Sequence, residues 1–217
     1  MNIVALFVAP LIVVTAEAFA NTQMPYLLAD PGYYNQPADK VASIVSRAFF
    51  WGSLSATVIV PFMGYAYEIC GRYWLIVPGV FLTVIIFFLF PLVAPSIAAL
   101  YAFRSIFSVL AGIVMHNPLL ADYIRSESRG HGMGIIGYGS IFGHILMVAL
   151  FEFSRSMTRS VQFLMAAFVL LILAIYLAFI VREPKIMEKK TLDNGQVVLR
   201  EIDRNQDLRT SIDNLTK

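Results

Sequence analysis

The sequence predicts an all-α membrane protein with six transmembrane helices, and three observations lead to this fold class. Hydrophobic residues make up 59% of the 217 residues and charged residues 14%, whereas soluble domains are about 45–50% apolar. Six apolar segments are each long enough to cross a hydrocarbon core, which takes about 20 helical residues. In chain order these segments are polar, polar, apolar and again polar, polar, apolar, which predicts a three-plus-three inverted repeat.

The apolar runs place the six spans along the chain. The first has no basic leader of the kind that a signal peptide carries, so we expect it to remain as a span. Small residues in the second predict close helix packing, the nearly pure apolar third and sixth predict lipid-facing helices, and the fifth has glycines on more than one face. The expected spans are residues 3–21, 43–64, 73–92, 97–115, 133–151 and 161–181.

Composition divides the chain into a six-helix bundle, residues 1–183, and a polar segment, residues 184–217, which we interpret as a cytoplasmic tail or a linker between two halves. Within the polar segment, Asp193-Asn194-Gly195 between apolar residues favours a β-hairpin. More lysines and arginines lie in the connections on the side of the termini than on the other side, which favours cytoplasmic termini. The first side has Arg72, Arg125, Arg129, Arg182, Lys185, Lys189 and Lys190, and the second Lys40, Arg47, Arg155 and Arg159.

A short charged motif, GYAYEICGRY, separates the second and third spans. Gly64 and Gly71 permit a tight turn, and Glu68 and Arg72 are four residues apart, the spacing of side chains that meet on one helical turn. This Gly-x-x-x-(Asp/Glu)-x-x-Gly-Arg pattern resembles the loop between the second and third helices of the major facilitator superfamily of membrane transporters. Two positions depart from the family pattern, because Glu68 replaces the usual Asp and Tyr73 replaces a common second basic residue.

The connection between the fourth and fifth spans carries a second part of this resemblance. An acid at the end of the fourth helix followed by Arg-Gly at the start of the fifth is common in the superfamily, and Asp122 with Arg129-Gly130 matches it. The resemblance implies one six-helix half of a transporter, in which Glu68, Arg72, Asp122 and Arg129 form a network that closes the cytoplasmic face. The alternative for the arginines is ordinary anchoring by positive charge at the cytoplasmic surface.

Glu17 and Arg104 are charged residues inside predicted spans. An isolated charge at the middle of a membrane costs at least about 2.5–3.5 kcal/mol, so such residues face a cavity or a partner. The resemblance implies that the first and fourth helices line a central cavity, where Glu17 would bind a proton or a cationic group and Arg104 an anionic group. The alternatives are a structural ion pair, or a Glu17 close enough to the interface to be hydrated.

Three further polar residues are candidates for the same cavity. His144 could titrate near neutral pH and relay protons, although a histidine satisfied by helix packing is the alternative. Asn21 and Gln23 follow Glu17 on the first span and complete the candidate set.

The sequence has no motif for enzymatic chemistry, such as a Walker loop or His-Glu-x-x-His. Its single cysteine, Cys70, allows no intrachain disulfide and no thiol-based zinc cluster. We therefore expect no catalytic site, metal or cofactor, and the net charge of +2 gives no reason to expect a nucleic-acid partner. The fifth span also lacks the Gly-Pro-x-x-Gly-Gly element typical of drug–proton antiporters.

Two functions fit these observations. The first is half of a secondary transporter, symporter or uniporter, that moves a small polar solute by alternating access, with or without proton coupling. Since the family binds solutes between two halves, such a chain needs a second half, either a second copy or a C-terminal half. The second function is a membrane subunit that keeps the fold without transport and serves assembly in a larger complex.

Overall fold

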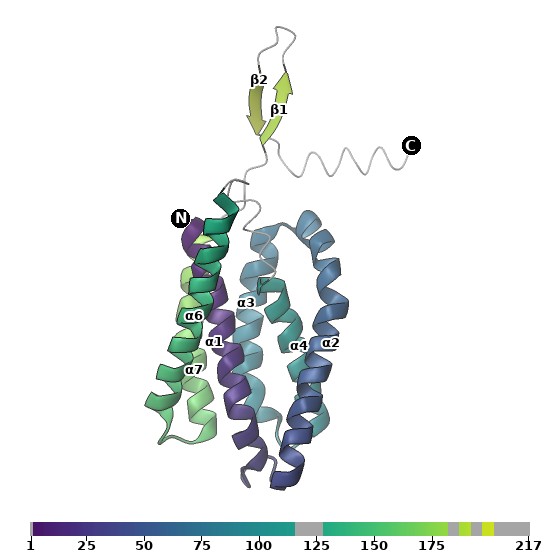
Figure 1. Ribbon diagram of the computed structural model, residues 1–217, viewed down its shortest axis with the longest axis vertical. Coiled ribbons are helices and arrows are strands. Elements are labelled where there is room, and N and C mark those ends of the chain that lie inside the picture. Colours follow the sequence, from purple (N-terminus) through teal and green to yellow (C-terminus); the bar gives the residue numbers. More distant parts are fainter. Residues whose placement is uncertain (1, 116–127, 182–186, 192–196, 202–217) are drawn as a thin grey trace. The chain divides into compact units, whose positions relative to one another are not determined.

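A computed structural model describes residues 2–115, 128–181, 187–191 and 197–201 (Figure 1). The chain divides into two compact units, Met1–Arg182 and Glu183–Lys217. Among the described residues of the first unit, six helices are long and apolar enough to cross a membrane, as predicted. The described helices of this unit are α1 (Asn2–Ala29), α2 (Ala38–Cys70), α3 (Arg72–Leu89) with the 3₁₀-helix η1 (Phe90–Val93), α4 (Ile97–Met115), α6 (Arg129–Ser154) and α7 (Arg159–Ile180).

Two helices extend beyond their predicted ends. α1 continues through Pro25 to Ala29, although the sequence predicted an end near Asn21. A proline removes one backbone hydrogen bond, and packed membrane helices tolerate this loss. α2 continues through Gly64 to Cys70, so most of the predicted turn is helical. The break occurs at Gly71, whose φ of 89° is a conformation that favours glycine.

The helices pair in a pattern that fits a three-plus-three repeat. The most extensive contacts join α1 to α6 and α2 to α4, which run side by side in Figure 1. Smaller contacts join α3 to α4, α1 to α7 and α3 to α7. If the first three spans are exchanged in order with the last three, α1–α6 becomes α4–α2 and α3–α4 becomes α7–α1. The main contacts are therefore equivalent in pairs.

The core lies around α1, the helix most buried by the rest of the unit. Five phenylalanines, one each from α1, α3, η1, α4 and α7, form a continuous aromatic cluster with ring centroids 5.1–6.4 Å apart. Edge-to-face pairs at these distances add to the stability gained from burial. These residues are Phe19, Phe87, Phe90, Phe107 and Phe163.

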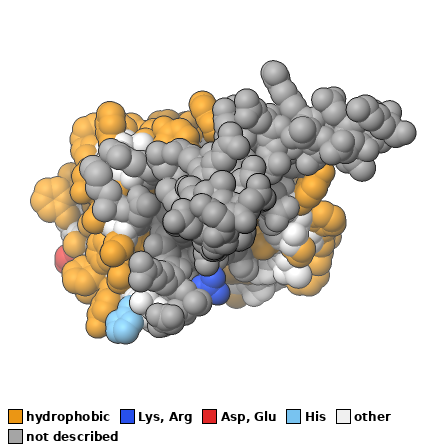
Figure 2. Space-filling view, turned by 90° about the horizontal axis from the view of Figure 1, so that it is seen from above, with side chains coloured by type: hydrophobic (Ala, Val, Ile, Leu, Met, Phe, Trp, Pro, Cys, Tyr) orange, Lys and Arg blue, Asp and Glu red, His pale blue; other side chains and the backbone are white. Residues whose placement is uncertain are grey.

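The outer surface is apolar, as a lipid-facing surface requires. Viewed from above, hydrophobic side chains lie along much of the left and right edges (Figure 2). α3 exposes Ile85 and Phe88, and α7 exposes Phe168 and Ile172, consistent with the prediction that both helices border lipid. However, α2 and α6 are the least buried helices, which the sequence pattern did not predict.

The second unit contains a two-stranded antiparallel hairpin, as the sequence predicted. Strands β1 (Met187–Thr191) and β2 (Val197–Glu201) pair with Thr191 opposite Val197. The predicted turn residues Asp193, Asn194 and Gly195 lie outside the described residues.

Candidate functional site

An ion pair joins α1 to α4 near the middle of both helices. Arg104 Nη2 donates a hydrogen bond to Glu17 Oε1 at 3.1 Å. The sequence placed these two charges in different spans 87 residues apart, and folding brings them into contact. Each charge thereby gains a partner of opposite sign, which a charge inside a membrane requires.

The two members of the pair differ strongly in exposure. The Arg104 side chain is 2% exposed, whereas that of Glu17 is 39% exposed. The guanidinium carbon of Arg104 lies 4.7 Å from the ring centroid of Phe49 on α2 and 5.7 Å from that of Phe107. Aromatic faces at such distances stabilise a cation. Among the described residues, Arg104 Nε and Nη1 have no hydrogen-bond partner.

Glu17 lies on a face of α1 that the other described helices leave partly open. Ala18, Asn21 and Thr22 share this face and are also half-buried. Thr22 Oγ1 donates to the carbonyl of Ala18, and Asn21 Oδ1 is buried without a partner among the described residues. The carboxylate of Glu17 is thus the most accessible charged group at this site, and a ligand from the open side would meet it before Arg104.

Gln23 lies apart from the ion pair, in a buried network at the end of α1. Its Oε1 accepts a hydrogen bond from Arg159 Nη1 at 3.3 Å, and the same nitrogen donates to Gln162 Oε1 at 3.1 Å. Gln162 Nε2 in turn donates to the carbonyls of Ser154 and Met157. These hydrogen bonds join α1 to the segment between α6 and α7. The side chain of Gln23 is therefore part of a network that holds these elements together.

The connection between α1 and α2 is anchored on the same end of α7. Tyr33 OH and Ser160 Oγ are 2.6 Å apart, and the Ser160 backbone N–H donates to Tyr33 OH. The neighbouring Tyr34 is buried, and this burial raises the pKa of its hydroxyl to about 12.

His144 is exposed on α6, with Nδ1 3.0 Å from the carbonyl oxygen of Ser140. Among the described residues it makes no hydrogen bond or ion pair with Glu17 or Arg104. The described contacts therefore do not connect His144 to the ion pair, as a direct proton relay between them would require.

The predicted gating motif is described in part. Gly71 forms the tight link between α2 and α3, and its N–H donates to the carbonyl of Tyr67. Gly64 lies within α2, and no atom lies within 4 Å of where a Cβ would be at this position. Asp122 and the side chains of Glu68 and Arg72 lie outside the described residues, so the charge network stays a prediction.

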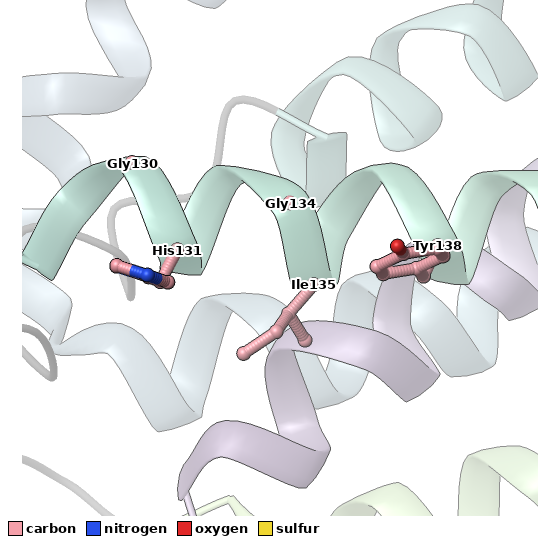
Figure 3. Close-up of a pocket in the computed structure, with 5 residues that line it drawn as sticks. All are labelled: Gly130, His131, Gly134, Ile135 and Tyr138. Atoms are coloured by element: carbon pink, nitrogen blue, oxygen red, sulfur yellow. The ribbon is translucent and has the colours of Figure 1, made fainter.

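Arg129 and Gly130 open α6, where Gly130 lines a hollow of about 640 Å³. All its lining residues come from the first three turns of this helix (Figure 3). The others are His131, Gly134, Ile135 and Tyr138.

Sequence reasoning missed two residues that shape these environments. Phe49 covers Arg104, but an aromatic residue in an apolar span gives no signal of that role. Arg159 was counted as a loop charge, although its position at the first turn of a span could have suggested contact with polar residues of α1. Within the described residues, no group of three His, Cys, Asp or Glu side chains could hold a metal ion.

The sequence pattern of the Major Facilitator Superfamily matches residues 6–211, which is nearly the whole chain. No curated protein and no solved structure matches.

Proposed function

Because the chain belongs to the major facilitator superfamily, we propose that it is one half of a secondary active transporter that moves a small polar solute by alternating access. The family and the six apolar helices indicate an integral, multi-pass membrane protein with a transporter-like role. The observation that carries the proposal is the Glu17–Arg104 pair, which places charge near the middle of α1 and α4 with one side open. Charges at this depth mark solute or ion paths.

A second half would cover α2 and α6. These are the least buried helices of the bundle, and they are equivalent under the exchange of the two triplets. Their exposed apolar residues include Phe50 and Val58 on α2 and Ile141 and Ile145 on α6. The second half is a further copy of this chain or a C-terminal half that residues 184–217 link to the first.

The connections on the side of the termini would form the gate. In this proposal the termini are cytoplasmic, and Glu68, Arg72, Asp122 and Arg129 hold the cytoplasmic face closed until the solute binds. The abrupt turn at Gly71 supports this arrangement, because it keeps the ends of α2 and α3 adjacent.

The test is uptake into proteoliposomes made with the purified protein together with any second half that it retains. The vesicles are incubated with the low-molecular-mass fraction of a cell extract, washed, and analysed by mass spectrometry. We expect at least one polar solute to enter faster than into empty vesicles. Glu17→Ala should abolish this uptake, and Tyr176→Phe, a change on the exposed surface of α7, is the control.

Two results would contradict the proposal. The first is that no solute enters faster than into empty vesicles, although the protein is inserted and folded; the non-transporting assembly subunit would then be the better assignment. The second is uptake that is unchanged in Glu17→Ala, which would place the solute path elsewhere.

A further inference from the structure

The ion pair between α1 and α4 is asymmetric, because Arg104 is enclosed and Glu17 is open to one side. We infer that the open face of α1 binds a cationic group of the solute, an ammonium, on Glu17, and that Arg104 is a positioning residue that does not touch the solute. The side-chain exposures of 39% for Glu17 and 2% for Arg104 carry this inference. It rests on the proposed function in taking this face as part of the solute path.

The charge arrangement selects the class of ligand. A group that approaches from the open face meets the carboxylate first and the guanidinium behind it, so a cation is attracted and an anion is repelled. A carboxylate has two acceptor oxygens with about four lone-pair positions, and Arg104 contacts one of them, Oε1. Glu17 therefore keeps acceptor positions for an ammonium, whose charge-assisted hydrogen bonds are stronger than those of a neutral hydroxyl.

Arg104 is held where a solute does not reach it. Phe49 covers its guanidinium, and a Cβ at Gly52 of α2 would lie 3.4 Å from its Cγ, so α2 packs against the side chain. Its Nη2 donates to Glu17 Oε1, and its Nε and Nη1 are buried without a partner among the described residues. An anionic solute would have to displace Glu17 to reach Arg104, whereas a cationic solute leaves the pair intact. The role of Arg104 is then to fix the position of the Glu17 carboxylate.

Asn21 carries a buried amide oxygen beside Glu17, on the same half-buried face of α1. Asn21 lies four residues, about one helical turn, beyond Glu17. Its Oδ1 has no hydrogen-bond partner among the described residues.

The test measures binding without transport. Ala18→Cys places a thiol next to Glu17 on the half-buried face, and the natural Cys70, exposed at the end of α2, serves as an internal control. The protein in lipid nanodiscs is alkylated with N-ethylmaleimide, and mass spectrometry gives the rate at each cysteine. The probes are propylammonium, propionate and 1-propanol, equal in size and concentration and at constant ionic strength. Propylammonium should slow alkylation at position 18 several-fold, 1-propanol less and propionate not at all, with no effect at Cys70.

Variants separate contact from positioning. Glu17→Gln should abolish protection by propylammonium. Because this change leaves Arg104 without its counter-charge and can prevent folding, the double variant Glu17→Gln/Arg104→Gln, which removes both charges, should lose protection as well. Arg104→Lys should keep the preference for the cation and weaken protection by less than Glu17→Gln does.

The inference would be overturned if propionate gave the protection and Arg104→Gln removed it, because Arg104 would then be the contact. It would also be overturned if no probe protected position 18, or if both charge-free and wild-type proteins bound propylammonium equally. Since alkylation needs no uptake, a failure of binding and a failure of transport are distinguishable.

Discussion

The two most extensive helix contacts, α1–α6 and α2–α4, are equivalent when the first three spans are exchanged with the last three, but different groups meet at each contact. At α1–α6, glycines of α6 face the backbone of α1. A Cβ at Gly139 would collide with the carbonyl of Phe7, and one at Gly143 would lie 3.0 Å from the carbonyl oxygen of Leu11. Glycine is the residue that allows two membrane helices to approach this closely.

At α2–α4, glycines face side chains instead. A Cβ at Gly52 would lie 2.5 Å from Ser108 Oγ, and one at Gly112 would lie 2.8 Å from Val60 Cγ2. A side chain can change rotamer, whereas a backbone carbonyl moves only with its helix. The comparison indicates that α1 and α6 are fixed to each other, and that α2 and α4 can adjust their contact.

Gly139→Ala tests the fixed contact and should have the largest effect. The added methyl group meets the Phe7 carbonyl and forces α1 and α6 apart. Overpacking of this kind costs about 1–3 kcal/mol, which exceeds the gain of about 1 kcal/mol in helix propensity from Gly to Ala. Thermal unfolding in detergent should show a clear fall in Tm.

Gly134→Ala is the matched control on the same helix. No atom lies within 4 Å of a Cβ at that position, so only the propensity gain remains and the Tm should stay constant or rise. Equal destabilisation by the two changes would mean that the α1–α6 contact does not depend on close backbone approach.

Gly112→Ala tests the adjustable contact, with an intermediate expected effect. Its neighbour Val60 is β-branched and has few rotamers inside a helix, so the contact relaxes only in part. We expect the free energy of unfolding to fall by about 1 kcal/mol, within the range of ordinary single changes. Gly112→Ala should cause a smaller fall when it is made in the Val60→Ala variant. A loss as large as that of Gly139→Ala would remove the distinction between the two contacts.

The sequence predicted the membrane fold well because its signals are local. Length, apolar composition and the position of each run are enough to define six spans. The ends of α1 and α2 were wrong because Pro25 and Gly64 act as breaks in water-exposed helices and much less in packed membrane helices.

The sequence identified the two charged residues of the ion pair, but it could not predict how exposed each of them is. Charge inside an apolar run singled out Glu17 and Arg104. Nothing local could show that Arg104 is enclosed while Glu17 is open, because exposure depends on which helices pack over each side chain. The hydrogen bond between Gln23 and Arg159 was not predictable for the same reason, since the two residues are far apart in the chain.

Thr15→Val tests a hydrogen bond across the fixed contact, with a smaller expected effect. Thr15 Oγ1 donates to the carbonyl of Gly143 at 3.0 Å and lies 2.6 Å from that of Leu11 in its own helix. Hydrogen bonds between membrane helices contribute about 0.6 kcal/mol on average. Valine keeps the shape and should lower stability by about that amount, whereas Thr15→Ser, which keeps the hydroxyl, should restore the bond. If both variants lost the same stability, the methyl group of Thr15 would be the important feature.

Gly52→Ala should have the smallest effect, although the distance at this position is among the shortest at either contact. The atom that a Cβ would meet is Ser108 Oγ, the end of a small side chain that can rotate away. The cost of that rotation is opposed by the propensity gain of about 1 kcal/mol, so the net change should lie within about 0.5 kcal/mol. Ser108→Ala removes the obstacle, and the double variant should therefore be more stable than Ser108→Ala alone. A double variant that is less stable would show that α2 cannot approach α4 with a methyl group at position 52, and that both contacts are fixed by glycine.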